Sequence, residues 1–370
     1  MDASIIANLC VYILTWNVGT HHPDDISMMG ALSLDGTSSC PDQRLPDIYV
    51  VGLQEVSTHA KNQLFNIFHD DPWTFKVSEY LIPYDYIKVS TEQLQGILVM
   101  MFVQPKHEPH IKDVEVQNTR TGLRGLWGNK GAVSIRMTLY GTGVTFVGAH
   151  LAAHDQKLAK RIEHYNQIVN NHHYKTSKYR SIFDHDCVFW FGDLNFRLTG
   201  TDSARDVRSL VEQGKLDELI ERDQLLLLRK KGKEAFALLT EQLPTFPPTF
   251  KFIEGTSEYD LKRRPAWCDR ILHRVQELRN PDIVLGITQL SYKSHPDYVL
   301  SDHKPVSAEF LYKIEAQTQT DDKLYELMHR DRRNEAPLAN SSCSLIPKWS
   351  HQFIKKLKQK KETKFERRVC

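Results

Sequence analysis

Polar side chains that can bind phosphate or a hard metal ion follow several apolar segments of this 370-residue sequence. Asn17, Glu55, His150 and Asp193 each come where such a segment ends. Loops at strand ends are where a rigid scaffold holds functional side chains, so we expect these residues to meet in one site. Any one of them alone is more often a turn residue or a helix cap, and the prediction therefore depends on their occurring together.

The residue types in this set fit metal-assisted hydrolysis of a phosphoester. Glu55 and Asn17, with Asp302 as a further candidate, supply hard oxygen ligands, which suit Mg²⁺ better than zinc or copper. His150 and His303 can donate hydrogen bonds to phosphate oxygens. In such a site a cation neutralises the developing charge while histidines stabilise the oxyanions.

A second group of polar residues could handle the attacking water. Asp193 and Asn195 lie two residues apart, directly after the apolar segment that ends at Gly192. Across a tight turn they could hold a water molecule and a phosphate oxygen together. The pair therefore predicts the position of the hydrolytic water.

Longer strings around these residues carry a family resemblance. Residues 191–197 (FGDLNFR), 265–270 (PAWCDR) and 301–306 (SDHKPV) strongly resemble signatures of the inositol polyphosphate 5-phosphatases. Residues 128–131 (GNKG) and 150–154 (HLAAH) fit the same family. The first two strings are the specific ones, because a GD-x-N string alone also occurs in related nucleases and sphingomyelinases. The resemblance covers residues 8–313.

The resemblance implies a four-layered α/β sandwich of the DNase-I-like type and one Mg²⁺ ion. It also implies removal of the 5-phosphate from phosphoinositides, with the 4,5-bisphosphate and 3,4,5-trisphosphate favoured, or from soluble inositol polyphosphates. Asn17 and Glu55 would then sit at the metal, Asn195 at the scissile phosphate, and Asp193 would align or deprotonate the water. Residues 121–123 and 189–191 look like the skeletal-muscle-and-kidney-enriched and proline-rich branches of the family.

Further roles follow from the same resemblance. His303 would contact the scissile phosphate, and Asp269 would hold the other nitrogen of its ring. His150 would be a second imidazole on the phosphate, and Asp302 would sit near the metal. Water is the direct nucleophile in the superfamily, so no covalent intermediate is expected, and Cys268 is interpreted as a packing residue.

Substrate recognition is expected in a basic segment before Pro265. Lys251, Lys262, Arg263 and Arg264 could bind a second phosphate through charge-assisted hydrogen bonds, and the family uses this stretch for the 4-phosphate. A solvated basic loop is the alternative interpretation. The sequence departs from the family here, with Phe250 at a common tyrosine position and Leu261 at a common lysine position.

Two further surfaces are assigned to substrate and membrane. Asn129 and Lys130, in the GNKG string, are expected to bind substrate. Leu123, Leu126 and Trp127 lie among arginines and could enter a bilayer interface. The alternative for the apolar residues is that they belong to the core.

The elements that must position these residues are short strands alternating with helices. Apolar runs predict strands at 9–15, 47–53, 96–103, 132–139, 144–150, 187–192 and 305–311. An apolar stripe predicts a helix over 155–171 with Asp155 as its N-cap, and a second helical region over 203–229 is expected to break at Gly214. The mixture favours two packed sheets with helices outside, although periodicity alone also fits a doubly wound sheet.

Composition describes a globular protein, with 41% hydrophobic and 25% charged residues. No apolar run approaches the roughly 18 residues of a membrane span, and no basic segment of a secretory signal follows Met1. The six cysteines form no C-x-x-C pair, which argues against a zinc ribbon or a disulfide framework and for a reducing compartment. We therefore expect a monomeric, cytoplasmic protein, peripheral on membranes.

Charge is unevenly distributed along the chain. The net charge is +2, but residues 348–370 carry +7, which leaves the first 347 residues at −5. The expected organisation is a catalytic domain at 8–313, a linker at 314–347 and a basic tail at 348–370, where an amphipathic membrane segment or a solvated tail would fit. The expected partner is an anionic phosphoinositide membrane and not a nucleic acid, while protein partners are unknown.

Two other functions stay open. A nuclease or a sphingomyelinase-like phosphodiesterase of the same superfamily would use the same metal chemistry. A nuclease needs a basic surface for several phosphates, which the acidic first 347 residues do not favour. A catalytically silent membrane-binding scaffold is disfavoured because every expected catalytic position holds a competent residue.

Overall fold

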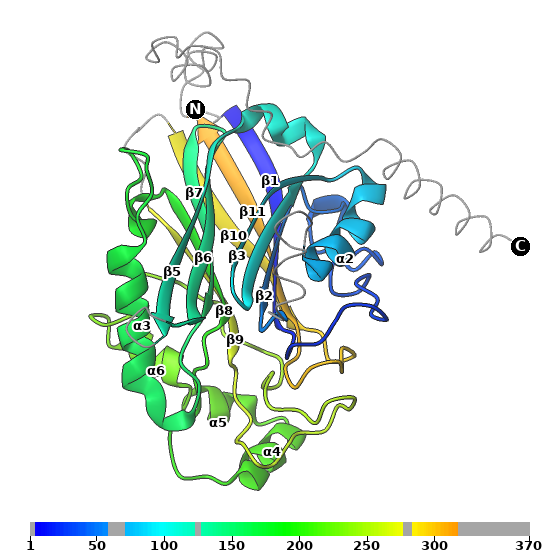
Figure 1. The fold of residues 1–370 in the computed structure, drawn as a ribbon, viewed down its shortest axis with the longest axis vertical. Coiled ribbons are helices and arrows are strands. Elements are labelled where there is room, and N and C mark those ends of the chain that lie inside the picture. Colours follow the sequence, from blue (N-terminus) through cyan, green and yellow to red (C-terminus); the bar gives the residue numbers. More distant parts are fainter. Residues whose placement is uncertain (1–3, 58–70, 123–126, 277–282, 317–370) are drawn as a thin grey trace, which may run out of the picture.

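The computed structural model describes residues 4–57, 71–122, 127–276 and 283–316 (Figure 1). These residues form two mixed β-sheets with helices on their outer faces. Sheet A has six strands and sheet B has five. The predicted linker and basic tail lie outside the described residues.

Sheet A is built around two parallel central strands, β1 and β2, and its other pairings are antiparallel. Its strands, in sheet order, are β10 (Ile283–Ser294), β11 (Val306–Ala316), β1 (Ser4–Asn17), β2 (Ile48–Gln54), β4 (Ile97–Val103) and β3 (Ile87–Leu94).

Sheet B has the same plan, with one parallel pair, β7 and β8, among antiparallel neighbours. Its strands, in sheet order, are β5 (Ile111–Gly122), β6 (Trp127–Leu139), β7 (Thr142–His150), β8 (Cys187–Asp193) and β9 (Asp269–Val275).

The main hydrophobic core lies between the two sheets. Successive side chains of a strand point to opposite faces, so Val50 of β2 belongs to this inner core while Val51 belongs to the outer face of sheet A. The sheets approach closely at Gly52, where an added Cβ would lie 2.3 Å from the ring of Phe191 on β8. The apolar strand sequences thus bury both faces, as their continuous runs predict.

Helices complete the four layers (Figure 1). Helix α2 (Pro72–Leu81) packs on the outer face of sheet A through residues such as Trp73 and Val77. Helices α3 (Leu158–Asn171) and α6 (Gln224–Lys230) cover sheet B through Tyr165, Ile168 and Leu225. The shorter helices are α4 (Ala204–Glu212) and α5 (Leu216–Ile220). This α/β/β/α arrangement is the predicted fold class.

Of the two details predicted for the helices, the break at Gly214 is confirmed and the N-cap at Asp155 is wrong. The break at Gly214 is confirmed, because Gly214 has a φ of 72° between α4 and α5. Asp155 is not the N-cap of α3, which begins at Leu158 after a 3₁₀ turn at Asp155–Lys157. Its carboxylate instead accepts hydrogen bonds from Arg264. A long-range ion pair here replaces the local cap that the sequence suggested.

The absence of disulfides was a wrong expectation. Cys10 of β1 is bonded to Cys40, 30 residues later in the chain, with a Cα–Cα distance of 5.9 Å. The pairing depends on the loop before β2 returning to the side of β1, which spacing along the chain does not reveal. The cysteines therefore no longer support a reducing compartment.

Among the described residues, no helix has both the length and the apolar character needed to cross a bilayer.

Burial makes several histidines resist protonation. It lowers the pKa to about 3 for His172 and to about 4 for His164, His185, His273 and His295. The unfolded chain binds these protons near pH 6.5, so it takes them up at a higher pH than the folded protein does. The stability from the neutral rings is therefore complete above pH 6.5 and declines as the pH falls toward 4.

We expect the free energy of unfolding to be lower at pH 5 than at pH 7.5, with His172 alone accounting for about 2 kcal/mol. The His172 ring lies between hydroxyls, with Nδ1 2.8 Å from Thr119 Oγ1 and Nε2 2.6 Å from Ser134 Oγ. Urea unfolding at both pH values measures the loss. His172→Gln, which cannot be protonated, should reduce the difference between the two pH values, and an unchanged difference would contradict the assignment.

Candidate active site

Strand register brings the predicted catalytic residues into one row across sheet B. His150, the last residue of β7, is opposite Asp193, the last residue of β8, and Asp193 is opposite Asp269, the first residue of β9. In sheet A, Asn17 ends β1 opposite Gln54, directly before Glu55. The two parallel pairs therefore deliver their carboxyl-terminal residues to a common site.

Asp193 is the centre of this site and is only 1% exposed. Its Oδ2 accepts a hydrogen bond from Asn17 Nδ2 at 3.0 Å and lies 3.2 Å from His150 Nε2. Its Oδ1 accepts from the backbone N–H of Asn195 at 3.0 Å. Burial opposes the ionised form, but the charge of His303 and the hydrogen bond with His150 outweigh it and hold the pKa of Asp193 well below its usual range.

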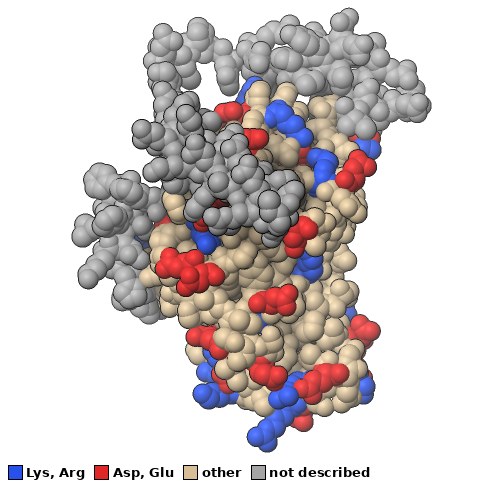
Figure 2. All heavy atoms as spheres, turned by 90° about the vertical axis from the view of Figure 1, so that its right-hand side faces the viewer, with Lys and Arg blue, Asp and Glu red and all other residues tan. Residues whose placement is uncertain are grey.

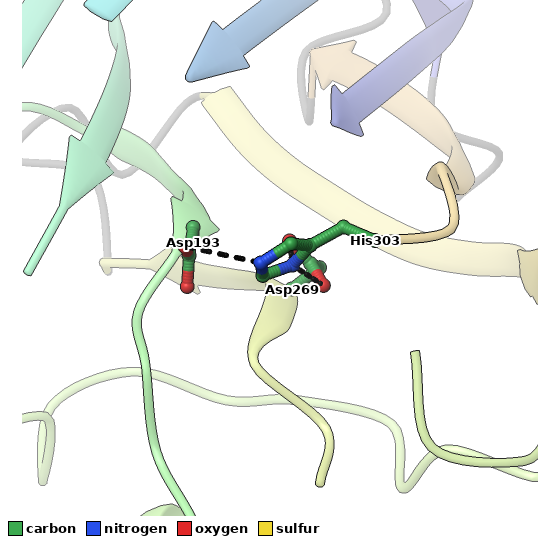
Figure 3. Close-up of side chains that lie close together, drawn as sticks. All are labelled: Asp193, Asp269 and His303. Atoms are coloured by element: carbon green, nitrogen blue, oxygen red, sulfur yellow. Dashed lines mark hydrogen bonds and ion pairs between the residues drawn. The ribbon is translucent and has the colours of Figure 1, made fainter. Parts of the chain in front are cut away.

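His303 and Asp269 form a buried pair beside Asp193 (Figure 3). His303 Nδ1 lies 2.9 Å from Asp269 Oδ2, and Thr249 Oγ1 donates to the same oxygen at 2.7 Å. The other ring nitrogen, Nε2, lies 3.9 Å from Asp193 Oδ2. Burial disfavours the imidazolium, yet the carboxylates of Asp269 and Asp193 raise the pKa of His303 to about 9. His303 is therefore a cation at neutral pH.

His150 has the opposite protonation behaviour. Burial and the neighbouring ammonium of Lys130 lower its pKa, so its ring is neutral. Lys130 Nζ contacts His150 Nε2, and Glu55 Oε1 lies 3.8 Å from the same nitrogen. Glu55 follows β2 with a φ of 56°, and its side chain is 44% exposed. Lys130, predicted to bind substrate, thus contacts the catalytic residues directly.

The turn after β8 aims Asn195 and contains an arginine that the sequence analysis did not assign. An added Cβ at Gly192 would lie 1.9 Å from Ala149 O, so only glycine fits between β7 and β8. Arg197, 4% exposed, donates from Nη2 to Asn195 Oδ1 at 2.6 Å and lies over the ring of Phe250. Arg197 stood within the string 191–197, but nothing in the sequence indicated its partner.

The basic residues predicted to recognise a second phosphate divide into two groups. Lys262 and Arg263 have exposed side chains on the segment before Pro265. Arg264 is fully engaged, donating to Asp155 Oδ2 at 3.1 Å and to the carbonyls of Leu198 and Gly200. These hydrogen bonds hold the segment before Pro265 against the rest of the domain.

Asp302 lies with a basic residue at the edge of the site. Lys251 Nζ is 2.5 Å from Asp302 Oδ2, and His303 Nε2 is 4.0 Å from Asp302 Oδ1. Asn129 is exposed. Leu123 and Leu126 lie outside the described residues, and so does the side chain of Trp127.

Two groups of residues near Asp193 could supply ligands to a divalent cation. Among the described residues, ligand atoms of Asp193, Asp269 and His303 lie within 4.8 Å of one another. Because His303 and Asp269 are hydrogen-bonded to each other and His303 is cationic, these two are a poor ligand pair. Glu55 and Asn17, on the sheet A side, retain the oxygen chemistry that suits a hard divalent ion.

Comparisons with known proteins agree with this geometry. The endonuclease/exonuclease/phosphatase family 2 matches residues 14–309. The chain is 38% identical over 82% of its length to phosphatidylinositol 4,5-bisphosphate 5-phosphatase A of Mus musculus, and it spans about a third (31%) of that relative. The family match includes every candidate catalytic residue described above.

Solved structures give the same family. The inositol polyphosphate 5-phosphatase domain of SpSynaptojanin, in complex with inositol (1,4)-bisphosphate and calcium ion, is 32% identical with a TM-score of 0.70. The match covers 88% of this chain and 91% of that one. A Cimex nitrophorin ferrous NO complex, 24% identical with a TM-score of 0.64 over 84% of this chain and 99% of its own, shares the fold alone. The chain therefore belongs to the inositol polyphosphate 5-phosphatase family, within endonuclease/exonuclease/phosphatase family 2.

Proposed function

We propose that this chain hydrolyses the 5-phosphate of phosphoinositides, and of soluble inositol polyphosphates, by direct attack of water. The observation that carries the proposal is the ionised Asp193 held 3.9 Å from the imidazolium of His303, which is itself paired with Asp269. An anion that can orient water and a cation that can bind a phosphoryl oxygen then face the same point. Relatives of this chain carry 5-phosphatase names, which supports the same reaction.

Asp193 would orient the water more than deprotonate it. A carboxylate whose pKa lies far below its usual range is a weak base. Phosphoryl transfer has a loose transition state in which positioning and charge stabilisation contribute most of the catalysis. The fixed hydrogen bonds from Asn17 and Asn195 supply that positioning.

His303 and Arg197 would stabilise the phosphate. The imidazolium is charged at neutral pH and presents Nε2 toward Asp193, where the phosphoryl group would enter. Arg197 fixes the side-chain Oδ1 of Asn195, and one N–H of Asn195 Nδ2 donates to Leu151 O at 3.2 Å, which leaves the second N–H of Nδ2 for a phosphate oxygen. Preorganised donors of this kind act strongly because the site is buried.

A divalent ion, which we infer to be Mg²⁺, would be held by Glu55 and Asn17. When bound it supplies charge neutralisation at the phosphoryl oxygens. The Glu55 carboxylate and the amide oxygen of Asn17 fit a hard cation. Within the part of the chain that the structure describes, Asn17 Oδ1 accepts a single hydrogen bond, from Gly19 N at 3.0 Å, so it keeps a lone pair for the ion.

Ring selection would come from the basic loop. Lys262 and Arg263 are exposed and could bind a second phosphate, with Lys251 behind them beside Asp302. We infer peripheral contact with a phosphoinositide membrane from the proposed substrate class, to which the 49% exposed Ile253 on the same loop adds one apolar side chain. Arg264 would hold the loop in place through Asp155.

A nuclease is the weaker alternative. On the face shown in Figure 2, the described Lys and Arg side chains are scattered among Asp and Glu. A protein that neutralises several phosphates of a duplex needs a more continuous basic surface. The acidic balance of the first 347 residues points the same way.

Asp193→Asn should lower kcat by about 10²- to 10⁴-fold, because the amide lacks the charge that orients water and supports the imidazolium. Orthophosphate release from a short-chain phosphatidylinositol 4,5-bisphosphate, with Mg²⁺ and with EDTA, measures this. Asp186→Asn is the matched control, since Asp186 is also a buried carboxylate beside β8, and its Oδ2 accepts from Gly143 N and Tyr179 Oη, which are not part of the candidate active site. Turnover of duplex DNA or sphingomyelin, with none of the inositol lipid, would favour the alternative.

Asp269→Asn should lower the pKa of His303 by about 1 to 3 pH units, because the imidazolium loses its charged partner. The protonated fraction at pH 8 then falls, and any alkaline limb of the rate profile moves to lower pH. An NMR titration of the His303 ring reports the pKa without turnover. Thr249→Val, which removes a hydrogen bond to Asp269 but no charge, should cause a smaller change, and equal effects of the two variants would contradict the assignment.

The double variant Lys262→Ala/Arg263→Ala should raise KM about tenfold for substrates with a 4-phosphate and leave kcat within twofold. Substrates that lack the 4-phosphate should show no change. Lys233→Ala, at an exposed lysine after α6, is the control. A KM that responds equally for both substrate classes would rule out recognition of the 4-phosphate by these side chains.

A further inference from the structure

A second cavity, with a volume of about 630 Å³, lies on the outer face of sheet B. It is bounded by β5, by β6 and by residues 175–179. Arg136 and Thr138 line it, while the intervening Ile135 and Met137 point into the inner core. The volume falls within the range of sites for small ligands.

The cavity is remote from the active site. Gly131 of β6 is opposite His150, whereas Arg136 is opposite Thr145, five residues further along the same pair of strands. At about 3.4 Å per residue the two positions are roughly 17 Å apart. A ligand in this cavity would therefore not contact the catalytic residues.

Arg136 is a buried cation whose hydrogen bonding is incomplete. Its side chain is 1% exposed, Nε donates to His185 Nε2 at 3.2 Å, and Nη1 donates to Asp113 O at 2.8 Å. Nη2 is buried without a hydrogen-bond partner, and no carboxylate of the described residues forms an ion pair with the guanidinium. Burial lowers the pKa of Arg136 even though Asp113 and Glu115 lie near enough to favour the charged form, and its Nη2 has no acceptor. An unpaired donor on a buried cation is costly, so an anionic ligand that accepts from Nη2 would remove an existing penalty.

The rim of the cavity adds more positive charge. Lys112, Lys175 and Lys178 are exposed, and none of them has an ion-pair partner among the described residues. Lys178 Nζ lies over the ring of Tyr179, 4.9 Å from its centroid. These ammonium groups lie at the rim of a site whose interior guanidinium has one nitrogen, Nη2, without a hydrogen-bond partner.

The two acidic residues of the lining are already occupied by other groups. Asp113 Oδ2 accepts a hydrogen bond from Thr138 Oγ1 at 3.1 Å, and Glu115 Oε1 accepts from the backbone N–H of Lys175 at 2.7 Å. Four basic side chains therefore face two carboxylates that have hydrogen bonds of their own. The balance favours an anion over a metal cation.

We propose that this cavity is a second anion site, which binds the phosphate monoester groups of a small polyphosphate or of a lipid headgroup. Arg136 would give its free Nη2 to a phosphate oxygen, and the three lysines would bind further oxygens through charge-assisted hydrogen bonds. The proposal stands independently of the reaction at Asp193. Occupancy would link β5 to the segment 175–179 across the cavity.

The test compares two charge reversals of equal size in the full-length chain. Lys175→Glu/Lys178→Glu changes the rim, and Lys230→Glu/Lys233→Glu changes two exposed lysines that do not line the cavity. Calorimetry with inositol hexakisphosphate forms the soluble arm. Flotation with phosphatidylcholine vesicles, with or without phosphatidylinositol 4,5-bisphosphate, forms the lipid arm.

The proposal requires at least a tenfold loss of binding in one arm for the rim variant and less than a threefold loss for the control. Loss in the soluble arm identifies a free polyphosphate, and loss in the vesicle arm identifies a headgroup. Arg136→Lys should weaken binding as well, with circular dichroism as a check that it folds. If the rim variant and the control bind alike in both arms, the proposal is overturned and any observed binding belongs to the active site or another surface.

Discussion

The structure of the active site depends on the burial of one carboxylate, Asp193. Taking an ionised carboxylate out of water costs several kcal/mol unless cations and hydrogen-bond donors replace the lost solvent. Here the imidazolium of His303, the ammonium of Lys130 and the amides of Asn17 and Asn195 replace it. The same groups are the ones a phosphoryl group would meet. The groups that stabilise the buried charge of Asp193 are therefore the same groups that the proposed catalysis needs.

Strand pairing makes this compensation geometrically possible. The parallel pair β7 and β8 places His150 beside Asp193, and the antiparallel pair β8 and β9 places Asp269 on its other side. A shift of one residue in either register would turn Asp193 to the opposite face of the sheet. The close contacts at Gly52 and Gly192 hold β8 in place, because neither position has room for a Cβ atom.

A shared fold does not by itself assign a reaction. The nitrophorin structure and this chain have the same architecture, although the nitrophorin is described as a ferrous NO complex. What separates the functions is the set of side chains at the strand ends. In this chain those ends hold Asn17, Asp193 and the His303–Asp269 pair, a set suited to phosphate chemistry. The outer cavity at Arg136 gathers four basic side chains at a second place on sheet B.

The buried strands and the residue types of the site could be predicted from the residues alone. Long apolar runs such as residues 187–192 are stable only when they are buried in a core. The strands that contain such runs were therefore predicted close to their observed positions, namely β1, β2, β4, β6, β7, β8 and β11. The strands β3 and β5 were missed because their side chains are partly exposed and mostly polar. The strand β10 was missed because polar residues and a glycine interrupt its apolar ones, and β9 was missed because it begins with charged residues. Helix α2 was also missed.

Which of these residues interact depends on how the whole chain packs. The Cys10–Cys40 bond, the hydrogen bonds of Arg197 to Asn195 and of Arg264 to Asp155, and the contact of Lys130 with His150 join residues through the crossing of distant segments. Hydrophobic periodicity fixes which face of an element is buried but carries no information about which element lies opposite. Register, sheet order and loop path supply that information, and all three arise from packing the whole chain.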